Sequence, residues 1–468
     1  MTQLVNGDGA VLVAGAGVSG LGAAKLLRAV GARFVVADDN PANQERVREA
    51  VGAETVTTAE ARDRLGEFGT VVTSPGWRPD TPLLVATGEA GIEVIGDVEL
   101  CYRLDRAGVF GPPRTWLVVT GTNGKTTTTG MLAAIMREAE NDTGLRAQAC
   151  GNIGVAVSDA LLDPERVDVL VAELSSFQLH WSQQLTPDAG VLLNLADDHI
   201  DWHGSFAAYA DAKAKVLHAR SAVVGVDDPE VVRLAERTGR KDIVGFTLGE
   251  PSASEAGVVG GRIVFNNAGE LIDLASAEGI EPAGVAGVLD ALAAAAVAVT
   301  QGVAPGRIQA GLVGYRVEGH RGAVVHSAGG VDWVDNSKAT NPHAADSALA
   351  GAGEPGTVVW VAGGQLKGAS VDRLIAEHAH LFRAVALLGV DRGIIHDALR
   401  RLAPGVPVFS TASTDPGAAM DECVAFAART ARPGDTVVLA PAAASLDMFS
   451  GMSARGDAFA AAAMRHCP

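Results

Sequence analysis

The most constraining feature of this sequence is a repeated unit in which a short apolar run meets a turn of Gly, Asp or Ser and then an Ala- and Leu-rich stretch. Near-continuous apolar strands that alternate with helices are typical of parallel sheets covered on both faces. The repeat therefore predicts an α/β protein. The runs expected to form strands are Ala10–Ala14, Arg33–Ala37, Thr70–Thr73, Trp116–Thr120, Val169–Ala172, Gly190–Leu193, Val331–Val334, Val358–Ala362 and Thr436–Leu439.

Two breaks in this pattern divide the chain. Arg106–Arg114 carries Gly and Pro residues between a helical stretch and a strand, and Gly311–Gly322 follows an Ala-rich helix at Leu289–Thr300. The Gly- and Ser-rich stretch Gly249–Glu281 favours a short antiparallel hairpin around Gly261–Val264. A length of 468 residues favours three domains at the usual ~150 residues each. We expect three domains, each a mainly parallel sheet flanked by helices. Residues 1–110 would form a Rossmann-like domain, residues 111–317 a P-loop ATPase-like domain, and residues 318–468 a second Rossmann-like domain.

Composition disfavours several classes of partner. The formal charge of −18 provides no cationic surface for a phosphate backbone, so a nucleic-acid role is disfavoured. The most apolar run, Ala291–Val299, is far shorter than the ~20 residues that span a bilayer, and Met1–Gly9 shows no signal segment. The four cysteines are far apart without a CxxC pair, which favours a reducing compartment. We expect a cytoplasmic monomer that acts on small molecules, away from membranes.

The first expected strand leads into a dinucleotide-type turn. Gly15, Gly17 and Gly20 have the GxGxxG spacing, and Asp38 lies near the end of the next expected strand. In this motif the start of a helix approaches phosphate and the carboxylate approaches a ribose hydroxyl. The same turn also fits another nucleotide, or a tight βα turn that binds nothing. A dehydrogenase would rest on this motif alone.

The strongest motif is TGTNGKTT at residues 120–127, directly after an expected strand. Successive backbone N–H groups would cradle phosphate, Lys125 would reach the β and γ oxygens, and Thr126 would bind Mg²⁺. The loop departs from GxxxxGK[ST] because Val119 stands at the first Gly position. A lysine in such a turn would be costly to bury without an anion. The loop therefore predicts an ATP site, formed by Gly121, Thr122, Asn123, Gly124, Lys125, Thr126 and Thr127.

Chemically active side chains also follow the neighbouring strands. Glu173 stands where a nucleotide-bound Mg²⁺ would need an oxygen ligand, although a carboxylate in the first turn of a helix is the alternative. His199 and His203 have i, i+4 spacing, but Ile200 occupies the position where an HExxH zinc site needs Glu. A zinc hydrolase is therefore disfavoured, and His199 beside the phosphate loop favours a second divalent ion.

Polar residues follow the strands of the third expected domain as well. Ligands of open α/β sheets bind beyond the carboxyl ends of the strands, so side chains at several strand ends favour one shared pocket. We therefore expect a pocket for an anionic substrate there. The His320-Arg321 pair before these strands would reach a nucleotide phosphate. The pocket residues are Asp335 and Lys338 in DNSKATN, Lys367 after a Gly pair, and Ser445 after Ala440–Ala444.

Taken in order, the strings GTNGKTT, ELSSFQL, DDHID with a downstream YADAK, GHR and DNSKATNP resemble those of the Mur ligases of peptidoglycan synthesis. The resemblance spans nearly the whole chain and is closest to the branch that adds D-glutamate, whose SPG turn matches SPGW at residues 74–77. It implies an ATP-dependent ligase that phosphorylates UDP-MurNAc-L-alanine and joins D-glutamate to the acyl phosphate. Another Mur-type or folylpolyglutamate-like ligase is the nearest alternative, and a non-catalytic nucleotide-binding module is a more distant one.

The resemblance also implies roles for individual residues. Two Mg²⁺ sites would be held by Thr126, Glu173, His199 and Lys213, with Lys213 carbamylated, and the catalytic set would be Lys125, Glu173, His199 and Lys213. ATP would also contact Asp290, Arg321 and Asp335. The UDP-substrate would contact Val18, Ser19, Asp38, Asp39, Gly76, Asn152 and His199. D-glutamate would contact Lys338, Thr340, Lys367, Ser445 and Leu446.

Three positions depart from the family pattern. Residues 284–290 read GVAGVLD where the family usually has GxHNxxN, which leaves Asp290 to replace one contact to the base. Met452 stands where the family often has an aromatic residue near the substrate, and Asn40 where some members have Arg near the uridine. None of these departures affects the phosphate or metal residues.

Overall fold

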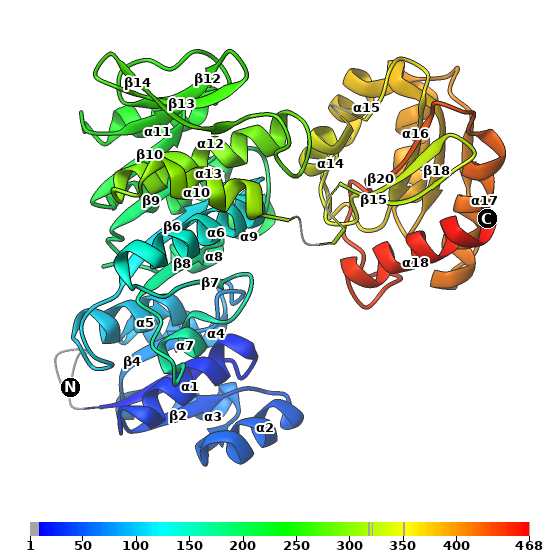
Figure 1. Cartoon of the computed structure of the whole chain (residues 1–468). Coiled ribbons are helices and arrows are strands. Elements are labelled where there is room, and N and C mark those ends of the chain that lie inside the picture. The colour runs from blue at the N-terminus through cyan, green and yellow to red at the C-terminus, as the bar shows by residue number, and fades with distance from the viewer. Residues whose placement is uncertain (1–8, 317–318, 321, 350–351, 468) are drawn as a thin grey trace. The chain divides into compact units, whose positions relative to one another are not determined.

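The computed structural model describes residues 9–316, 319–320, 322–349 and 352–467 (Figure 1). Three sheets of five, nine and six strands, with helices between the strands, confirm the predicted α/β class. The chain divides into two compact units, one up to Gly279 together with Leu289–Tyr315, the other Ile280–Val288 together with the residues from Arg316 onwards. The predicted boundaries at 110/111 and 317/318 stay predictions. No helix among the described residues has the length and apolar character needed to cross a membrane.

The first sheet is entirely parallel, in the order β3-β2-β1-β4-β5. Alternate residues of its strands face different cores, so that Val11 and Val13 lie in one apolar cluster while Leu12 and Ala14 lie in another. Its strands are β1 Ala10–Ala14, β2 Phe34–Ala37, β3 Glu54–Val56, β4 Phe68–Thr73 and β5 Glu93–Gly96. Its helices are α1 Val18–Ala29, α2 Pro41–Val51, α3 Thr58–Asp63, η1 Leu65–Glu67, α4 Pro82–Glu89 and α5 Asp97–Arg106.

The second sheet has the order β14-β13-β12-β11-β10-β9-β6-β8-β7 and is parallel from β7 to β12. The hairpin expected around Gly261–Val264 is present as antiparallel β12 and β13, and β14 extends it by one strand. The strands are β6 Thr115–Thr120, β7 Ala147–Gly151, β8 Val169–Glu173, β9 Ala189–Leu192, β10 Ser221–Gly225, β11 Val244–Phe246, β12 Glu255–Val259, β13 Arg262–Asn267 and β14 Glu270–Ser276. The helices are α6 Lys125–Thr143, α7 Val157–Leu162, α8 Ser176–His180, α9 Ile200–His203, α10 Phe206–Ala214, η2 Lys215–His218, α11 Pro229–Arg237, α12 Val285–Thr300 and α13 Pro305–Gly314.

One apolar cluster runs from the first sheet into the second, and helix α5 lies within it. Buried polar contacts reinforce this seam. Asp105 of α5 accepts hydrogen bonds from the Arg114 guanidinium (2.8 Å) and from the indole Nε1 of Trp116 (2.9 Å). Because these groups are buried and satisfied, the first two sheets form one packed body. This continuity explains why the compact units do not separate near residue 110.

The third sheet has the order β15-β16-β20-β17-β18-β19, with only the β15–β16 pair antiparallel. Strand β17 is buried on both faces, since Trp360 packs toward α14, α15 and α16 whereas Val361 packs toward α17 and α18. The strands are β15 Ala323–Ala328, β16 Val331–Asp335, β17 Val358–Gly363, β18 Phe382–Leu388, β19 Val408–Ser410 and β20 Thr436–Leu439. The helices are α14 Pro342–Leu349, α15 Asp372–His378, η3 Ala379–Leu381, α16 Arg392–Leu402, α17 Pro416–Thr430 and α18 Met452–His466.

Candidate active site

The phosphate loop joins β6 to the start of α6 and has little freedom to change shape. Gly124 precedes the helix with φ +79°, and a Cβ at this position would lie 2.1 Å from Oδ1 of Asp290. Only glycine fits there. Asn194 fixes the loop from the side, because its Oδ1 accepts from the Asn123 N–H (2.8 Å) and its Nδ2 donates to the Asn123 carbonyl (3.2 Å). The loop therefore presents the N-terminus of α6 in a set position, as an anion site requires.

Lys213 of α10 lies directly beneath this loop and is 2% exposed. Its Nζ donates to the Gly121 carbonyl (2.7 Å) and to Thr120 Oγ1 (3.2 Å). Burial lowers the pKa of Lys213 well below its usual value, and the nearby charge of Lys125 lowers it further. The carboxylates of Asp198 and Glu173 act in the opposite direction. Lys125 and Glu173 thus lie close enough to act on the charge of Lys213, and these are three of the residues that the resemblance to the Mur ligases assigns to catalysis.

Glu173 ends strand β8 and is 1% exposed. Its Oε1 accepts from the Asn152 side-chain amide (2.9 Å), whereas its Oε2 is buried and has no hydrogen-bond partner among the described residues. A buried carboxylate oxygen without a partner is costly, and a divalent cation would satisfy it. Glu173 therefore fits the predicted metal ligand better than it fits a first-turn helix carboxylate.

His199 precedes the single-turn helix α9 and adopts a left-handed backbone, with φ +52°. Its ring lies 4.6 Å from the ring of Phe177, which follows strand β8. Phe177 also lies 4.9 Å from Trp202 and stacks on His203 at 5.7 Å. These ring contacts hold His199 beside the segment that carries Glu173, although His199 lies seven residues beyond the end of β9 rather than directly at the strand end.

Tyr209 of α10 links this aromatic group to the phosphate loop. Its ring lies 5.5 Å from that of His203, and its hydroxyl is 2.8 Å from Thr122 Oγ1. Burial raises the pKa of Tyr209, which keeps the phenol neutral. Tyr209 and Asn194 were not predicted from the sequence as site residues. Tyr209 begins the string YADAK and Asn194 lies two residues after strand β9, but only the fold shows that each contacts the loop.

The first sheet carries a cavity of about 950 Å³ beyond its strand ends. Of the residues predicted to bind the UDP-substrate, Asp38, Asp39 and Gly76 line it, together with Arg62 and Arg78. The Asp38 carboxylate accepts from the backbone N–H groups of residues 16 (2.7 Å) and 40 (2.8 Å), so it also fixes the turn that begins α1. Val18, in that turn, is 76% exposed.

Asp290 lies against the phosphate loop, where its Oδ1 accepts from Thr128 Oγ1 (3.1 Å). It also borders a smaller cavity of about 200 Å³, lined in addition by Asn194, Phe246 and two aspartates, Asp227 and Asp228. Through its contacts with Gly124 and Thr128, Asp290 has a structural role in fixing the shape of the loop. A contact between Asp290 and the base of ATP stays a prediction.

The third sheet brings the residues predicted for D-glutamate to its strand ends. Lys338 and Thr340 follow β16, Lys367 follows β17 with φ +52°, and Ser445 follows β20. Ser445 is buried, whereas Leu446 beside it is 68% exposed. Asp335 is fully buried and its Oδ2 pairs with His320 Nδ1 (2.6 Å). Arg321, predicted to contact ATP, lies outside the described residues.

A buried guanidinium ties these strand ends together. Arg455 of α18 is 1% exposed and donates to Ser337 Oγ (3.0 Å) and to the carbonyls of Ser337 (2.8 Å) and Ala443 (3.0 Å). Burial lowers its pKa to about 10, which leaves it charged at neutral pH. Sequence reasoning missed Arg455, because its partners lie far from it along the chain.

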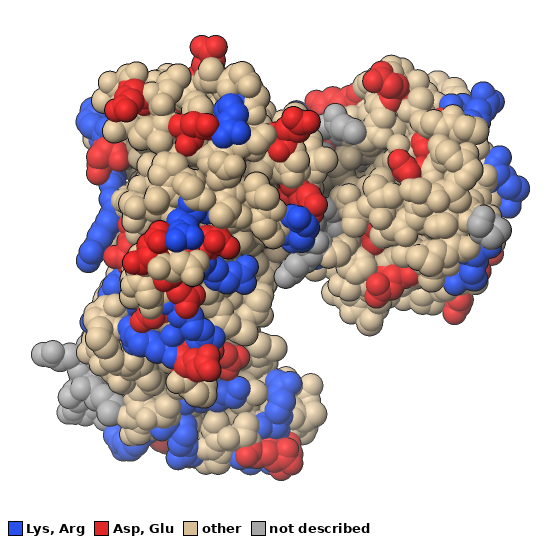
Figure 2. Space-filling view, viewed as in Figure 1, with Lys and Arg blue, Asp and Glu red and all other residues tan. Residues whose placement is uncertain are grey.

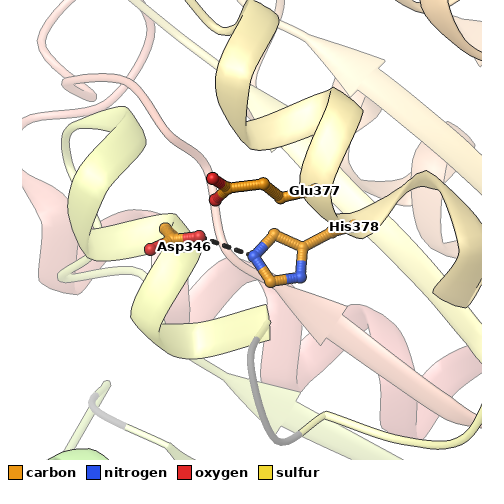
Figure 3. Close-up of side chains that lie close together, drawn as sticks. All are labelled: Asp346, Glu377 and His378. Carbon is orange, nitrogen blue, oxygen red and sulfur yellow. Dashed lines mark hydrogen bonds and ion pairs between the residues drawn. The ribbon is translucent and has the colours of Figure 1, made fainter.

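Among the described residues, one group of three side chains has the arrangement of candidate metal ligands, namely Asp346, Glu377 and His378 (Figure 3). His378 Nε2 lies 2.6 Å from Asp346 Oδ1, and Glu377 accepts from Arg373 Nε at 2.8 Å. Each of these groups is therefore already paired within the protein. The contacts connect α14 to α15, and we treat them as structural.

Charge on the visible face of the molecule is mixed. In Figure 2, acidic and basic side chains lie side by side across wide neutral areas, without a continuous basic stripe. With a net charge of −18, the protein as a whole would repel an anionic ligand, so a predicted anion site would depend on local donors such as Lys125 and the backbone of the phosphate loop.

Three family models match successive parts of the chain. They are a Mur ligase MurD-like N-terminal domain at residues 9–96, a Mur ligase middle domain at 119–298 and a Mur ligase glutamate ligase domain at 320–443. Their order follows the three sheets.

Curated relatives match over nearly the full length. A UDP-N-acetylmuramoylalanine–D-glutamate ligase of Corynebacterium diphtheriae is 58% identical, covering 98% of this chain and 96% of the relative. An enzyme of the same name from Mycobacterium avium is 47% identical, covering 97% of this chain and 96% of that one.

Solved structures support the fold. MurF from Acinetobacter baumannii superposes with a TM-score of 0.60 at 16% identity, covering 99% of this chain and 97% of that one. UDP-N-acetylmuramate-alanine ligase MurC from Thermotoga maritima gives 0.57 at 16% identity, covering 97% and 99%. The matched domains and the full-length relatives confirm the resemblance seen in the sequence: this chain belongs to the Mur ligase family.

Proposed function

We propose that this chain is an ATP-dependent ligase that joins D-glutamate to UDP-N-acetylmuramoyl-L-alanine, a step in peptidoglycan precursor synthesis. The observation that carries the proposal is the full-length match, at 58% identity, to a relative named for this reaction. The buried Lys213 and Glu173 beside a rigid phosphate loop support it, because they are the groups such a reaction needs.

The reaction needs an activated carboxylate, since a free carboxylate is a poor electrophile. A carboxylate oxygen of the L-alanine unit attacks the γ-phosphorus of ATP, and the bond from that phosphorus to ADP breaks. The amine nitrogen of D-glutamate then attacks the acyl carbon, loses a proton, and expels phosphate. Lys125 and the backbone N–H groups at the start of α6 would stabilise the negative charge of both steps.

The residues around Glu173 fit Mg²⁺. When bound there, the cation would neutralise phosphate charge and act as a Lewis acid. Glu173 Oε2, which is buried and lacks a partner, would be one ligand, with Thr126 and His199 as further candidates. ATP use follows from the family, while two separate Mg²⁺ sites are our proposal.

Lys213 is suited to carbamylation. Its buried amine has a lowered pKa, so a larger fraction is neutral and nucleophilic near pH 7 than for an exposed lysine. The neutral nitrogen would add to the carbon of CO₂ and release one proton, which converts a neutral amine into an anionic carbamate whose oxygens can bind a metal. This change would explain why a lysine is buried beside Glu173 in a site that has to hold a metal.

The three sheets would then divide the work. The cavity of the first sheet would take the uridine diphosphate through Asp38, Asp39 and Gly76, which line it, and Val18 and Ser19 would contact it from the start of α1. The second would take ATP and metal, with Asn152 near the substrate. The strand ends of the third would take D-glutamate. A cytoplasmic, monomeric enzyme is part of the proposal, and the free buried thiols of Cys101, Cys150 and Cys423 support a reducing compartment.

Phosphate release measured against a panel of amino acids tests the proposal. With ATP, Mg²⁺ and UDP-MurNAc-L-alanine present, D-glutamate should give sustained release and a ligated product by mass spectrometry. L-glutamate and meso-diaminopimelate should give neither. Equal turnover with either of these amino acids would contradict the assignment and favour another Mur-type or folylpolyglutamate-like ligase.

A further inference from the structure

Two hydrogen bonds connect the cavity of the first sheet to helix α9. The Arg78 guanidinium donates to the Asp201 carbonyl (2.7 Å), and the indole Nε1 of Trp202 donates to the Gly76 carbonyl (3.3 Å). Gly76 and Arg78 line the cavity of about 950 Å³. Asp201 and Trp202 lie in α9, which begins directly after His199. The cavity wall and the His199 segment are therefore in direct contact.

Helix α9 depends on such contacts for its position. It has only four residues, none of them buried, and it lacks a side-chain N-cap. A single turn has no stability of its own, because helix nucleation is unfavourable. The left-handed backbone of His199 adds a conformation that its surroundings must maintain. The contacts of Trp202 with Phe177 and with Gly76 are among those that can do so.

The contacts continue from α9 to the phosphate loop. The ring of Trp202 lies 4.6 Å from that of His203, and the ring of His203 lies 5.5 Å from that of Tyr209. Tyr209 then contacts Thr122 within the loop. All of these residues belong to one compact unit. A shift of the cavity wall would thus act on the His199 segment and on the loop through packed side chains.

We propose that Arg78 and Trp202 are positioning residues that couple the first-sheet cavity to the phosphate loop. A uridine nucleotide in the cavity holds the Gly76–Arg78 segment, and this segment holds α9 and His199 in place. Uridine diphosphate and Mg-ADP then strengthen each other's binding without touching. The identity of the two ligands rests on the proposed function, whereas the coupling rests on the two hydrogen bonds.

Calorimetry with the full chain tests this proposal. Mg-ADP is titrated with and without saturating UDP, and UDP is titrated with and without saturating Mg-ADP. We expect each ligand to raise the affinity of the protein for the other by the same factor, at least about fivefold, since linkage requires the two factors to be equal. In Trp202→Phe, which keeps a ring but loses the N–H that reaches Gly76, the factor should fall to near one.

Trp181→Phe is the matched control. Trp181 belongs to the same aromatic group, with its ring 4.8 Å from His180, but its Nε1 is buried without a hydrogen-bond partner among the described residues. This variant should keep the coupling factor of the wild type. A role limited to stability would lower the melting temperature of both variants and leave the factor unchanged in each. Arg78→Met removes the other hydrogen bond and keeps an apolar side chain, so it should also lower the coupling factor. This variant replaces Trp202→Phe in the test if Trp202→Phe does not fold.

The outcomes separate this inference from the proposed function. If UDP and Mg-ADP both bind but do so independently in the wild type, the coupling is wrong and the ligase assignment stands. If coupling persists in Trp202→Phe and Arg78→Met, the two hydrogen bonds do not carry it. If UDP does not bind at all, the proposed function fails and the coupling fails with it.

Discussion

The regions beyond the strand ends of the second and third sheets hold Lys213 and Lys367 in very different states. At the second sheet, Glu173 and Lys213 are almost completely buried and held by hydrogen bonds to the protein. At the third sheet, Lys367 and Leu446 are exposed, the latter by 68%. Both regions lie beyond the carboxyl ends of parallel strands, so topology alone does not account for the contrast.

We propose that the difference reflects the part of the reaction that each region would serve. Phosphoryl transfer needs charges and dipoles fixed before the substrate arrives, and the burial of Glu173 and Lys213 at the second sheet would provide this. A D-glutamate site at the third sheet would need open access, which the exposed Lys367 would allow. The rigidity of this region comes from beneath, where Arg455 links the ends of β16 and β20.

Replacing the buried lysine should produce the largest effect. Lys213→Ala should lower the ligation rate about a thousandfold, because it removes the group proposed to complete the metal site. Acetate should restore part of the rate by supplying a carboxylate in the vacated space. Steady-state assays with and without acetate measure both effects.

Lys215→Ala is the matched control for that experiment. Lys215 donates to the carbonyls of Leu179, His180 and Ser182, so its loss should lower thermal stability. Any fall in its ligation rate should not respond to acetate. Full activity of Lys213→Ala would contradict the proposed role of Lys213 in the metal site, and with it the proposed difference between the second and third sheets.

Glu173→Gln should have the next largest effect. It keeps the shape and the contact with Asn152 but removes the charge of the buried oxygen, so half-maximal activity should require up to about 100-fold more Mg²⁺. A Mg²⁺ titration of the rate measures this shift. An unchanged requirement for Mg²⁺ would mean that Glu173 is not a ligand.

At the third sheet a smaller and more selective effect is expected. Lys367→Ala should raise the KM for D-glutamate about tenfold, because the variant loses one hydrogen bond to a charged group. The KM for ATP should change little. Thermal stability should not change, because Lys367 is exposed. Arg429→Ala, which removes an exposed cation near the end of α17, should leave all KM values unchanged. Equal effects on D-glutamate and ATP would indicate a structural role for Lys367.

The smallest effect concerns His203 and pH. Burial lowers the pKa of His203 to about 4, below the ~6.5 of an unfolded histidine. Between these values the unfolded chain binds a proton that the folded chain does not, so His203 makes stability fall as the pH drops from about 6.5 to 4. The melting temperature of His203→Gln should therefore fall less between pH 7 and pH 5 than that of the wild type. An equal loss in both proteins would contradict the assignment.

Local sequence predicted the features that depend on neighbours along the chain. Each apolar run expected to be a strand is one, with its ends shifted by at most two residues, because burial on both faces demands a continuous run. The phosphate loop was predicted because Gly124 and Lys125 are adjacent. Nine other strands were not expected. Among them, β14 was missed because Asp273 interrupts its apolar residues and it extends a hairpin at the edge of the sheet, whereas β18 was missed although Phe382–Leu388 is largely apolar.

The supporting contacts could not be predicted in this way. Asn194 lies 71 residues from Asn123, Asp290 lies 162 from Thr128, and Arg455 lies 118 from Ser337. No spacing rule links residues at such distances, because the fold alone brings them together. Their chemistry is also ordinary, since amides, carboxylates and guanidinium groups are common at surfaces.

The most direct test of the account follows the oxygen atoms of the substrate. UDP-MurNAc-L-alanine labelled with ¹⁸O in its carboxylate is ligated to D-glutamate, and the released phosphate is analysed by mass spectrometry. The account predicts one ¹⁸O atom in each phosphate, because the carboxylate oxygen that attacks ATP leaves with the phosphate. Unlabelled phosphate formed alongside the ligated product would contradict an acyl phosphate at this site.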